Sequence, residues 1–352
     1  MTRNPQCLVI GDTHFNNSYP GYLEAQLKSC FDMVNKIKPK YVVFLGDIYH
    51  HRKPSPEVIV GVDRMFRKLS LIPGVTKMFI LRGNHDSANR SDDGLTVLTT
   101  LEGNGAKINI IDQTELEEDL NFLFIPHYEN EDTILESMTY AKDRDTIVFG
   151  HFGFEGCMNS TGFFDFELKK EDFKHRTILG HIHAYSRHTN ITVLGTPWST
   201  NFGEVDQTHY VGLLTMSDNG LWGDLKLKTP SYSPRHYVAT EESLEPMGED
   251  IADPNFFTVL RVIVSNFTEQ NYSDLKAECK EKYAAKHVDI KFQPILDKKL
   301  SKRLSGYNPN TPIANIDDDI VNKYIEEQST AIPIEDLKEG LDIIKRYEDN
   351  ET

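Results

Sequence analysis

The sequence is poor in cysteine and contains no long apolar run. Its four cysteines, Cys7, Cys30, Cys157 and Cys279, lie far apart, without the paired spacing of a disulfide framework or a zinc knuckle. We therefore expect reduced thiols and a cytoplasmic location. Apolar runs stop after about five residues, as in 41–45, and the first residues lack the apolar core of a signal peptide. We expect no contact with a membrane.

Positive charge is also scarce, which by itself argues against a nucleic-acid partner. The chain has 38 Lys and Arg against 54 Asp and Glu, a net charge of −16. Basic side chains nevertheless gather in one stretch: Lys276, Lys280, Lys282, Lys286, Lys291, Lys298, Lys299, Lys302 and Arg303. This stretch is either a solvated helix face or a surface that follows DNA phosphates. Carboxylates that bind metal ions are neutralised, so the acidic total does not exclude DNA.

The length and composition indicate a globular protein of more than one domain. The chain has 352 residues, 39% of them hydrophobic and 26% charged, against a usual domain size of roughly 100–200 residues. Polar stretches at 230–234 and 241–254 suggest one boundary, and the Pro- and Asn-rich segment 306–312 is a linker. We predict a core at 1–228, a small α+β cap at 229–305, and a linker with a helical tail at 306–352.

One pattern recurs in the first two-thirds of the chain. Short runs of aliphatic and β-branched residues end in glycine and a polar cluster, which is typical of strands buried on both faces. These runs are 8–10, 42–45, 79–81, 147–149 and 178–179. Apolar residues at helical spacing predict helices at 23–37 and 56–71. The fold class is therefore α/β, and chemistry is expected beyond the carboxyl ends of the strands.

The polar residues after the five glycines form a candidate metal site. They are Asp12, His14, Asp47, Asn84, His85, Asp86, His151, His181 and His183. In each Asp-x-His or His-x-His pair, alternation along extended backbone sends both side chains to one face. Nitrogen and oxygen donors without a thiolate suit manganese, iron or zinc better than calcium.

These donors are numerous enough for two ions. A carboxylate has two oxygens, so Asp47 at the end of a central strand can bridge the ions. Two ions about 3.5–4 Å apart can clamp a phosphodiester and lower the pKa of a bridging water. His85 directly follows a predicted ligand and cannot easily share its ion. We expect it to donate a hydrogen bond or a proton to the phosphate or the leaving oxygen.

The ordered set Asp-x-His, Gly-Asp, Gly-Asn-His-Asp, Gly-His and Gly-His-x-His resembles the calcineurin-like metallophosphoesterases, over roughly residues 7–215. The resemblance implies a sandwich of two sheets flanked by helices, and two divalent ions, with manganese expected. It assigns the ligands as follows: Asp12, His14, Asp47 and His183 for the first ion, and Asp47, Asn84, His151 and His181 for the second. It also makes His85 the transition-state histidine and Asp86 the partner that orients it.

Within that superfamily the chain is most similar to the SbcD-type double-strand-break repair nucleases, and among them to the recombination nucleases of T-even phages. The sequence after Asp47 is Ile-Tyr-His-His-Arg, without the Asp-Arg-Gly continuation of protein phosphatases. His50 stands where these relatives carry a residue that positions DNA. The alternative is a structural histidine, because His51 beside it could substitute. The Gly-Thr-Pro-Trp segment at 195–198 is also similar to the phage members.

The resemblance implies a nuclease that acts with partners. We expect a manganese-dependent DNA exonuclease and single-strand endonuclease, with a DNA-binding cap, in recombination and double-strand-break processing (in the host cytoplasm for a phage protein). The C-terminal helices would bind an SMC-like ATPase of the SbcC kind, and the chain would form a homodimer, for which helix 56–71 is a candidate. The alternatives are a phosphoesterase acting on a small phosphodiester or a phosphoprotein, and a catalytically silent scaffold.

Overall fold

The computed structural model describes residues 4–105, 107–159, 162–163, 166–265 and 269–292. The chain divides into two compact units, residues 1–293 and 294–352. The predicted tail, and Lys298, Lys299, Lys302 and Arg303 of the basic stretch, lie outside the described residues. The boundary between core and cap stays a prediction, because the first compact unit runs through it.

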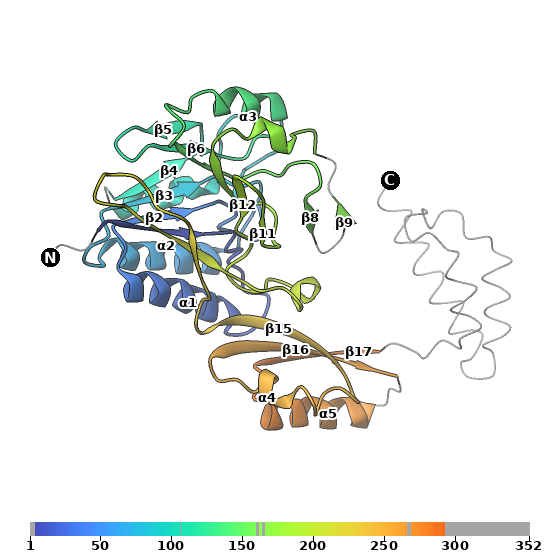
Figure 1. The fold of residues 1–352 in the computed structure, drawn as a ribbon. Coiled ribbons are helices and arrows are strands. Elements are labelled where there is room, and N and C mark those ends of the chain that lie inside the picture. Colours follow the sequence, from blue (N-terminus) through green and yellow to red (C-terminus); the bar gives the residue numbers. More distant parts are fainter. Residues whose placement is uncertain (1–3, 106, 160–161, 164–165, 266–268, 293–352) are drawn as a thin grey trace, which may run out of the picture. The chain divides into compact units, whose positions relative to one another are not determined.

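The first large sheet has the strand order β14-β13-β1-β2-β3-β4 (Figure 1). Its strands are β1 (Gln6–Ile10), β2 (Tyr41–Phe44), β3 (Lys77–Leu81), β4 (Ile108–Ile111), β13 (Val211–Thr215) and β14 (Lys226–Lys228). Strands β1 to β4 pair in parallel, whereas β13 and β14 pair antiparallel. The carboxyl ends of β1, β2 and β3 therefore lie at one edge of this sheet.

The second large sheet has the order β11-β12-β10-β7-β6-β5. Its strands are β5 (Glu115–Glu117), β6 (Phe122–Ile125), β7 (Ile147–Gly150), β10 (Arg176–Leu179), β11 (Ser186–Arg187) and β12 (Ile191–Val193). The middle strands β6, β7, β10 and β12 pair in parallel. A separate hairpin pairs β8 (Met158–Asn159) with β9 (Gly162–Phe163).

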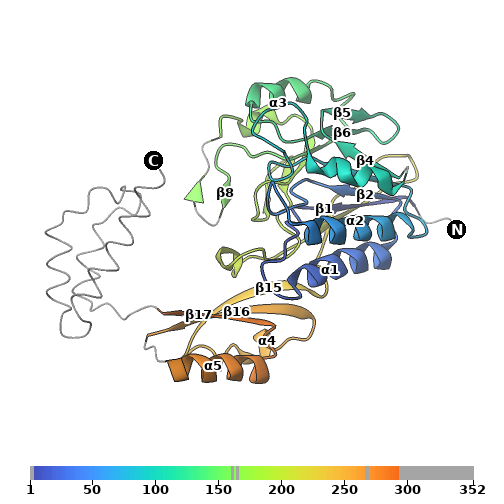
Figure 2. The ribbon, with the colours of Figure 1, turned by 180° about the vertical axis from the view of Figure 1, so that it is seen from behind.

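The two large sheets pack face to face. Val43 and Phe79 of the first sheet share a buried cluster with Phe124 and Phe149 of the second. The rings of Phe79 and Phe124 stack with their centroids 4.6 Å apart. Helix α3 (Glu131–Met138) lies on the face of the second sheet that points away from the first (Figure 2). Its buried Ile134 belongs to the hydrophobic cluster on that face. The predicted α/β class with two packed sheets is thus confirmed.

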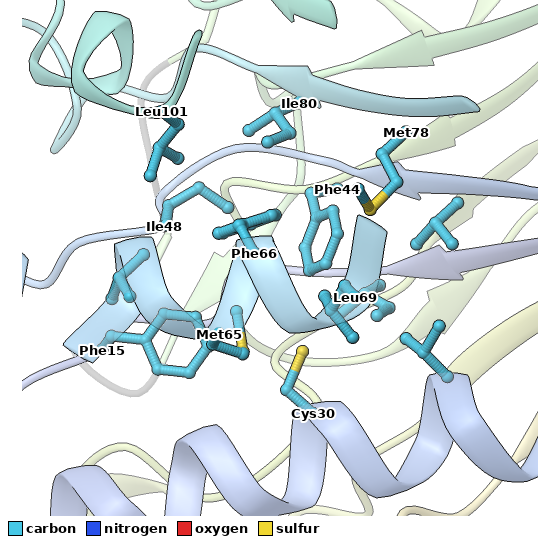
Figure 3. Packing of buried hydrophobic residues seen from close by; sticks show 14 of the residues in the cluster. Phe15, Cys30, Phe44, Ile48, Met65, Phe66, Leu69, Met78, Ile80 and Leu101 are labelled. Atoms are coloured by element: carbon cyan, nitrogen blue, oxygen red, sulfur yellow. The ribbon is translucent and has the colours of Figure 1, made fainter. Parts of the chain in front are cut away.

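Helices α1 (Tyr22–Ile37) and α2 (Pro56–Ser70) lie side by side on the outer face of the first sheet (Figure 1). The Ser55 side chain accepts a hydrogen bond from the Val58 backbone N–H, and proline at the first helical position begins α2. One face of α2 is buried through Met65, Phe66 and Leu69 (Figure 3). The predicted helices at 23–37 and 56–71 match the observed bounds to within a residue.

In the described part of the chain, three 3₁₀ helices occur in connecting segments. They are η1 (Val97–Asn104), η2 (Lys170–Asp172) and η3 (Phe202–Glu204). The four cysteines are free and buried, as expected from their spacing. Among the described helices, none is long and apolar enough to cross a membrane.

A smaller parallel sheet follows the two large ones, in the order β15-β16-β17. Its strands are β15 (Ser233–Thr240), β16 (Phe256–Val264) and β17 (His287–Phe292), and its helices are α4 (Gly248–Ile251) and α5 (Glu269–Lys282). Phe257 and Val259 of β16 pack on Tyr22 and Ala25 of α1. The sequence predicts a strand at 256–264, a helix at 272–285 and a strand at 288–292, which correspond to β16, α5 and β17. It predicts neither β15 nor α4, because both lie in or between the polar stretches that suggested a boundary.

Phe66 provides a test of the packing under α2. Its side chain is fully buried, and its ring lies 5.0 Å from that of Phe44. We expect Phe66→Ala to lower the free energy of unfolding by about 3–5 kcal/mol, because it leaves a cavity beneath the helix. Urea unfolding of Phe66→Ala beside Leu71→Ala measures this, since Leu71 is 79% exposed and its loss should cost less than about 0.5 kcal/mol. Equal stabilities of the two variants would contradict the packing.

Candidate metal centre

Loops after five strands bring the predicted site residues together. Three of these strands, β1, β2 and β3, belong to the first sheet, and β7 and β10 belong to the second. Parallel strands present their carboxyl ends at the same edge, and ligands bind there in open α/β sheets. Side chains separated by up to 169 residues in the sequence are consequently in hydrogen-bond range of one another.

The first donor group consists of Asp12, His14 and His183. One possible metal-ligating atom from each residue lies within 4.8 Å of those of the other two. The Nε2 atoms of the two histidines are 2.9 Å apart. Both oxygens of Asp12 are buried and find no hydrogen-bond partner among the described residues. Buried polar atoms are costly without partners, so this group fits a cation.

The second donor group is centred on Asn84. Its Oδ1 atom lies 3.1 Å from Nε2 of His151 and 3.0 Å from Nδ1 of His181. The other ring nitrogen of His151, Nδ1, lies 2.8 Å from the carbonyl oxygen of Leu45. A proton on Nδ1 would donate to that carbonyl and leave Nε2 free as a ligand.

Asp47 lies between the two groups. Its Oδ2 is 3.5 Å from Nε2 of His14, and its Oδ1 is 3.4 Å from Nε2 of His151. The backbone N–H of His85 donates to Oδ1 over 2.8 Å. Each oxygen thus faces a different donor group, which is the arrangement that a bridging carboxylate requires.

The loop backbone around Asp47 is strained and tightly packed. Asp47, His14 and His181 all have positive φ angles, of 47°, 45° and 76°. A Cβ added to Gly83 would lie 2.2 Å from Oδ1 of Asp47, so only glycine fits there. Such conformations persist where the surrounding structure over-determines them, and they cluster at functional sites.

Burial and close neighbouring charges shift the pKa values of the residues in this centre. Burial raises the pKa of Asp12 to about 7, with a further contribution from the nearby Asp47 carboxylate and opposition from His151. Burial lowers the pKa of His181 to about 3, and His151 adds to this effect. Burial opposes ionisation of Asp47 as well, but the adjacent His151 and His14 hold its pKa well below the usual range. Burial lowers the pKa of His151, but the Asp47 and Asp12 carboxylates outweigh it and raise that pKa to about 9. A metal ion binds the Asp47 carboxylate and neutral imidazoles, so its binding would displace a proton from His151.

The comparison with protein families agrees with this geometry. The calcineurin-like phosphoesterase family matches residues 6–185, which is just over half of the chain. The chain belongs to the calcineurin-like phosphoesterases. Members of this family use two divalent metal ions, and the two donor groups around Asp47 fit that requirement.

The other comparisons add little about substrate. A dimetal phosphatase from Danio rerio matches with 16% sequence identity and a TM-score of 0.37, over 66% of this chain and 97% of that chain. A similarity of this size carries no information about what this chain acts on. Among curated proteins, no sequence matches the chain.

His85 and His50 lie beside the first donor group. The rings of His85 and His50 are 5.0 and 5.4 Å from that of His14. Nδ1 of His85 is 2.5 Å from the carbonyl oxygen of His50, so it donates there and leaves Nε2 available. Burial, with His51 and His85 nearby, lowers the pKa of His50 to about 4. His50 is therefore neutral at physiological pH.

Asp86 differs from the expectation that it orients His85. Its carboxylate accepts hydrogen bonds from the backbone N–H groups of Ile48, Tyr49 and Gly83. These bonds fix the loop that carries Asp47, and the His85 ring is held by the His50 carbonyl instead. The reason is geometric: successive side chains on the loop point in different directions, so Asp86 faces into the loop whereas His85 faces the site.

Glu204 is a residue of the centre that the sequence did not reveal. Its Oε1 lies 2.7 Å from Nδ1 of His183, and the side chain is 1% exposed. Thr200 and Asn201 also donate to this carboxylate, over 2.6–2.8 Å. The bond to Nδ1 fixes the His183 tautomer with Nε2 free for a metal ion. The local sequence around Glu204 offers no motif, because the contact spans 21 residues and depends on the turn after Trp198.

We expect Glu204→Ala to weaken manganese binding about 10- to 100-fold, because His183 loses the partner that orients its ring. Titration of the metal-free protein with Mn²⁺, followed by electron paramagnetic resonance, measures the affinity and the number of bound ions. Asp206→Ala is the matched control, since Asp206 is an exposed carboxylate two residues away. Unchanged manganese affinity in a folded Glu204→Ala protein would contradict the assigned role.

Proposed function

We propose that the protein is a two-metal DNA phosphodiesterase, an exonuclease and single-strand endonuclease with manganese as its ion. The observation that carries the proposal is the Asp47 carboxylate, which lies between two donor groups with His85 alongside. The first ion would be held by Asp12, His14, Asp47 and His183. The second would be held by Asp47, Asn84, His151 and His181.

In the proposed reaction, the side chains of this centre have different roles. Bound metal ions would supply an activated water and stabilise charge on the phosphate oxygens. Asp47 fixes the relative position of the two donor groups through its two oxygens. His85 donates from Nδ1 to a carbonyl oxygen, and when its ring carries both protons Nε2 would donate the second one to the leaving oxygen. In this proposal the histidine that protonates the leaving group is separate from the metal ligands.

Three features support DNA as the substrate. His50 sits beside the first donor group, at the position after Asp47 that positions DNA in the SbcD-type nucleases the sequence resembles. Asp47 lacks the Arg-Gly continuation of protein phosphatases. Lys280 and Lys286 of the small α+β unit are exposed and can contact phosphates, whereas the nearby Lys282 pairs with Glu245 over 3.2 Å and does not support the proposal. The proposed DNA-binding cap rests on these residues.

A homodimer and an SMC-like ATPase of the SbcC kind complete the proposal. A groove of about 940 Å³ runs between α1 and α2, lined by Leu27, Phe31 and Val60 among others. Val60 is 45% exposed. A second copy placing its own α2 here would cover these apolar side chains. The C-terminal segment proposed to bind the ATPase lies outside the described residues, so that partner stays a prediction from the sequence.

We expect His85→Ala to reduce DNA cleavage about 10²- to 10⁴-fold while manganese still binds, because the variant loses a proton donor and no ligand. The assay uses end-labelled duplex and hairpin DNA with manganese, and Asp47→Ala serves as the metal-site reference. His188→Ala is the matched control, because His188 lies near Phe154, away from both donor groups. Cleavage at the parent rate in His85→Ala would overturn its role.

The same assay separates the alternatives. Turnover of bis(p-nitrophenyl) phosphate without any degradation of DNA would favour a phosphoesterase for small diesters or phosphoproteins. Absence of both activities in a manganese-loaded protein would favour a silent scaffold.

We expect Val60→Glu to convert a dimer into a monomer, because a carboxylate would be buried without a partner in the α1–α2 groove. Sedimentation equilibrium measures the mass of the full-length protein. Leu135→Glu on α3 is the matched control, since Leu135 is 39% exposed and lies outside the groove. A monomeric parent protein, or a dimer that survives Val60→Glu, would contradict this interface.

A further inference from the structure

A cavity of about 340 Å³ opens beside the second donor group. Asn84 and His181, two of the proposed ligands, line one end of it. Phe166, His127, Arg52 and Arg90 line other parts. A phosphate held at the metal centre would therefore have this cavity next to it, on the side of Asn84 and His181. The volume lies within the range of small-molecule sites, roughly 300–1,000 Å³.

The Phe166 ring gives the cavity an aromatic side on which a flat group can stack. Phe166 is partly exposed, and its ring lies 5.8 Å from that of His181. A Cβ on Gly153 would lie 2.2 Å from the Phe166 ring, so the absence of a side chain at 153 allows the ring to lie there. The buried Tyr128 and Phe152 add further aromatic rings to the lining. Bases of nucleic acids stack on such rings whatever their identity.

His127 is a polar group that lines the cavity next to His181. His127 lies against His181, with ring centroids 5.8 Å apart and an interplanar angle of 27°. Both of its ring nitrogens are buried and lack a hydrogen-bond partner among the described residues, with Glu129 3.6 Å from Nε2. A neutral imidazole has one donor and one acceptor, as the polar edge of a base does.

The charges around the cavity nearly cancel. Arg52 lies 3.8 Å from the Glu129 carboxylate and donates to the Asn89 carbonyl. The Glu131 carboxylate accepts from the backbone N–H groups of Glu167 and Leu168. Arg90 is exposed at the rim, where a guanidinium can stack on a ring. The cavity therefore suits an uncharged ring with polar edges better than a second phosphate.

We propose that this cavity binds a nucleoside of the substrate, the one attached to the phosphate held at the Asn84 and His181 end. The inference rests on the proposed function, because it takes the same centre to act on a nucleotide chain. It assigns the binding of the base to Phe166, Arg90 and His127, none of which has a role in the metal centre.

The test compares inhibitors of bis(p-nitrophenyl) phosphate hydrolysis by the manganese-loaded, full-length protein. The inhibitors are 2′-deoxyadenosine 3′-monophosphate and 2′-deoxyadenosine 5′-monophosphate. Each is compared with the deoxyribose phosphate that carries the phosphate at the same position and has no base. Base stacking predicts that one nucleotide inhibits at least about fivefold better than its base-free counterpart. Equal inhibition by nucleotide and base-free phosphate, for both positions of the phosphate, would overturn the proposal.

Two variants locate the effect. We expect Phe166→Ala and Arg90→Ala each to reduce the preference for the nucleotide over the base-free phosphate by about fivefold or more. Arg144→Ala is the matched control, because Arg144 is an exposed arginine outside the cavity. Arg90 is on the surface, so its replacement tests the site even if Phe166→Ala does not fold. A preference unchanged in Arg90→Ala and in folded Phe166→Ala would place the base elsewhere.

A second readout does not depend on catalysis. The fluorescence of 2-aminopurine deoxynucleoside monophosphate should be quenched by the full-length protein in EDTA, and less so by Arg90→Ala. The outcomes also separate this inference from the proposed function. A protein that prefers the nucleotide but leaves DNA intact would refute the nuclease proposal and keep the cavity. A protein that degrades DNA but does not prefer the nucleotide would support the nuclease proposal and refute the assignment of the cavity.

Discussion

Buried carboxylates without hydrogen-bond donors require a positive charge, and this requirement organises the whole centre. Asp12 is fully buried, and its oxygens lack hydrogen-bond donors among the described residues. Asp47 is 2% exposed, accepts a hydrogen bond from the His85 backbone N–H and lies between two histidine-containing groups. Removing such charges from water costs several kcal/mol each unless a cation or a donor repays it. These groups lie together because the packing of the two sheets brings the ends of five strands side by side.

The surrounding loops are shaped to hold the donors at fixed positions. Gly46 and Gly83 allow close approach: a Cβ on Gly46 would lie 2.4 Å from the His151 ring, and one on Gly83 would meet Asp47. Asp86 contributes by accepting three backbone hydrogen bonds, which removes freedom from the loop that carries Asp47. Rigid loops on a packed sandwich give the metal centre its geometry before any ion binds.

The segment that carries Glu204 also connects the centre to the small parallel sheet. Ser199 Oγ lies 2.9 Å from Nδ1 of His236 on β15, and the Arg261 guanidinium of β16 lies 3.9 Å from the Phe202 ring centroid. The carboxylate that orients His183 therefore sits in a turn held from two sides. Contacts of this kind offer a physical route by which the small sheet can influence the first donor group.

The sequence by itself determined the strand-end motifs, the α/β class and the two helices of the first sheet. These follow from local rules: apolar runs ending in glycine after 8–10 and 42–45, and helical spacing at 23–37. The sequence also marked the residues that the structure brings together around Asp47, but it did not show that their strands belong to two different sheets. Strand β15 was not, since its residues lie between polar stretches and pair only with β16.

Only the tertiary structure decided which side chain meets which. His14 and His183 are 169 residues apart, and the Glu204 contact depends on a turn that no motif marks. Asp86 and His85 are neighbours in sequence yet have different partners, because the loop directs one inward and the other toward the site. The cavity of Phe166 and His127 likewise forms from separate loops. Sequence spacing fixes which residues share a loop or a strand, whereas contacts between loops depend on how the sheets pack.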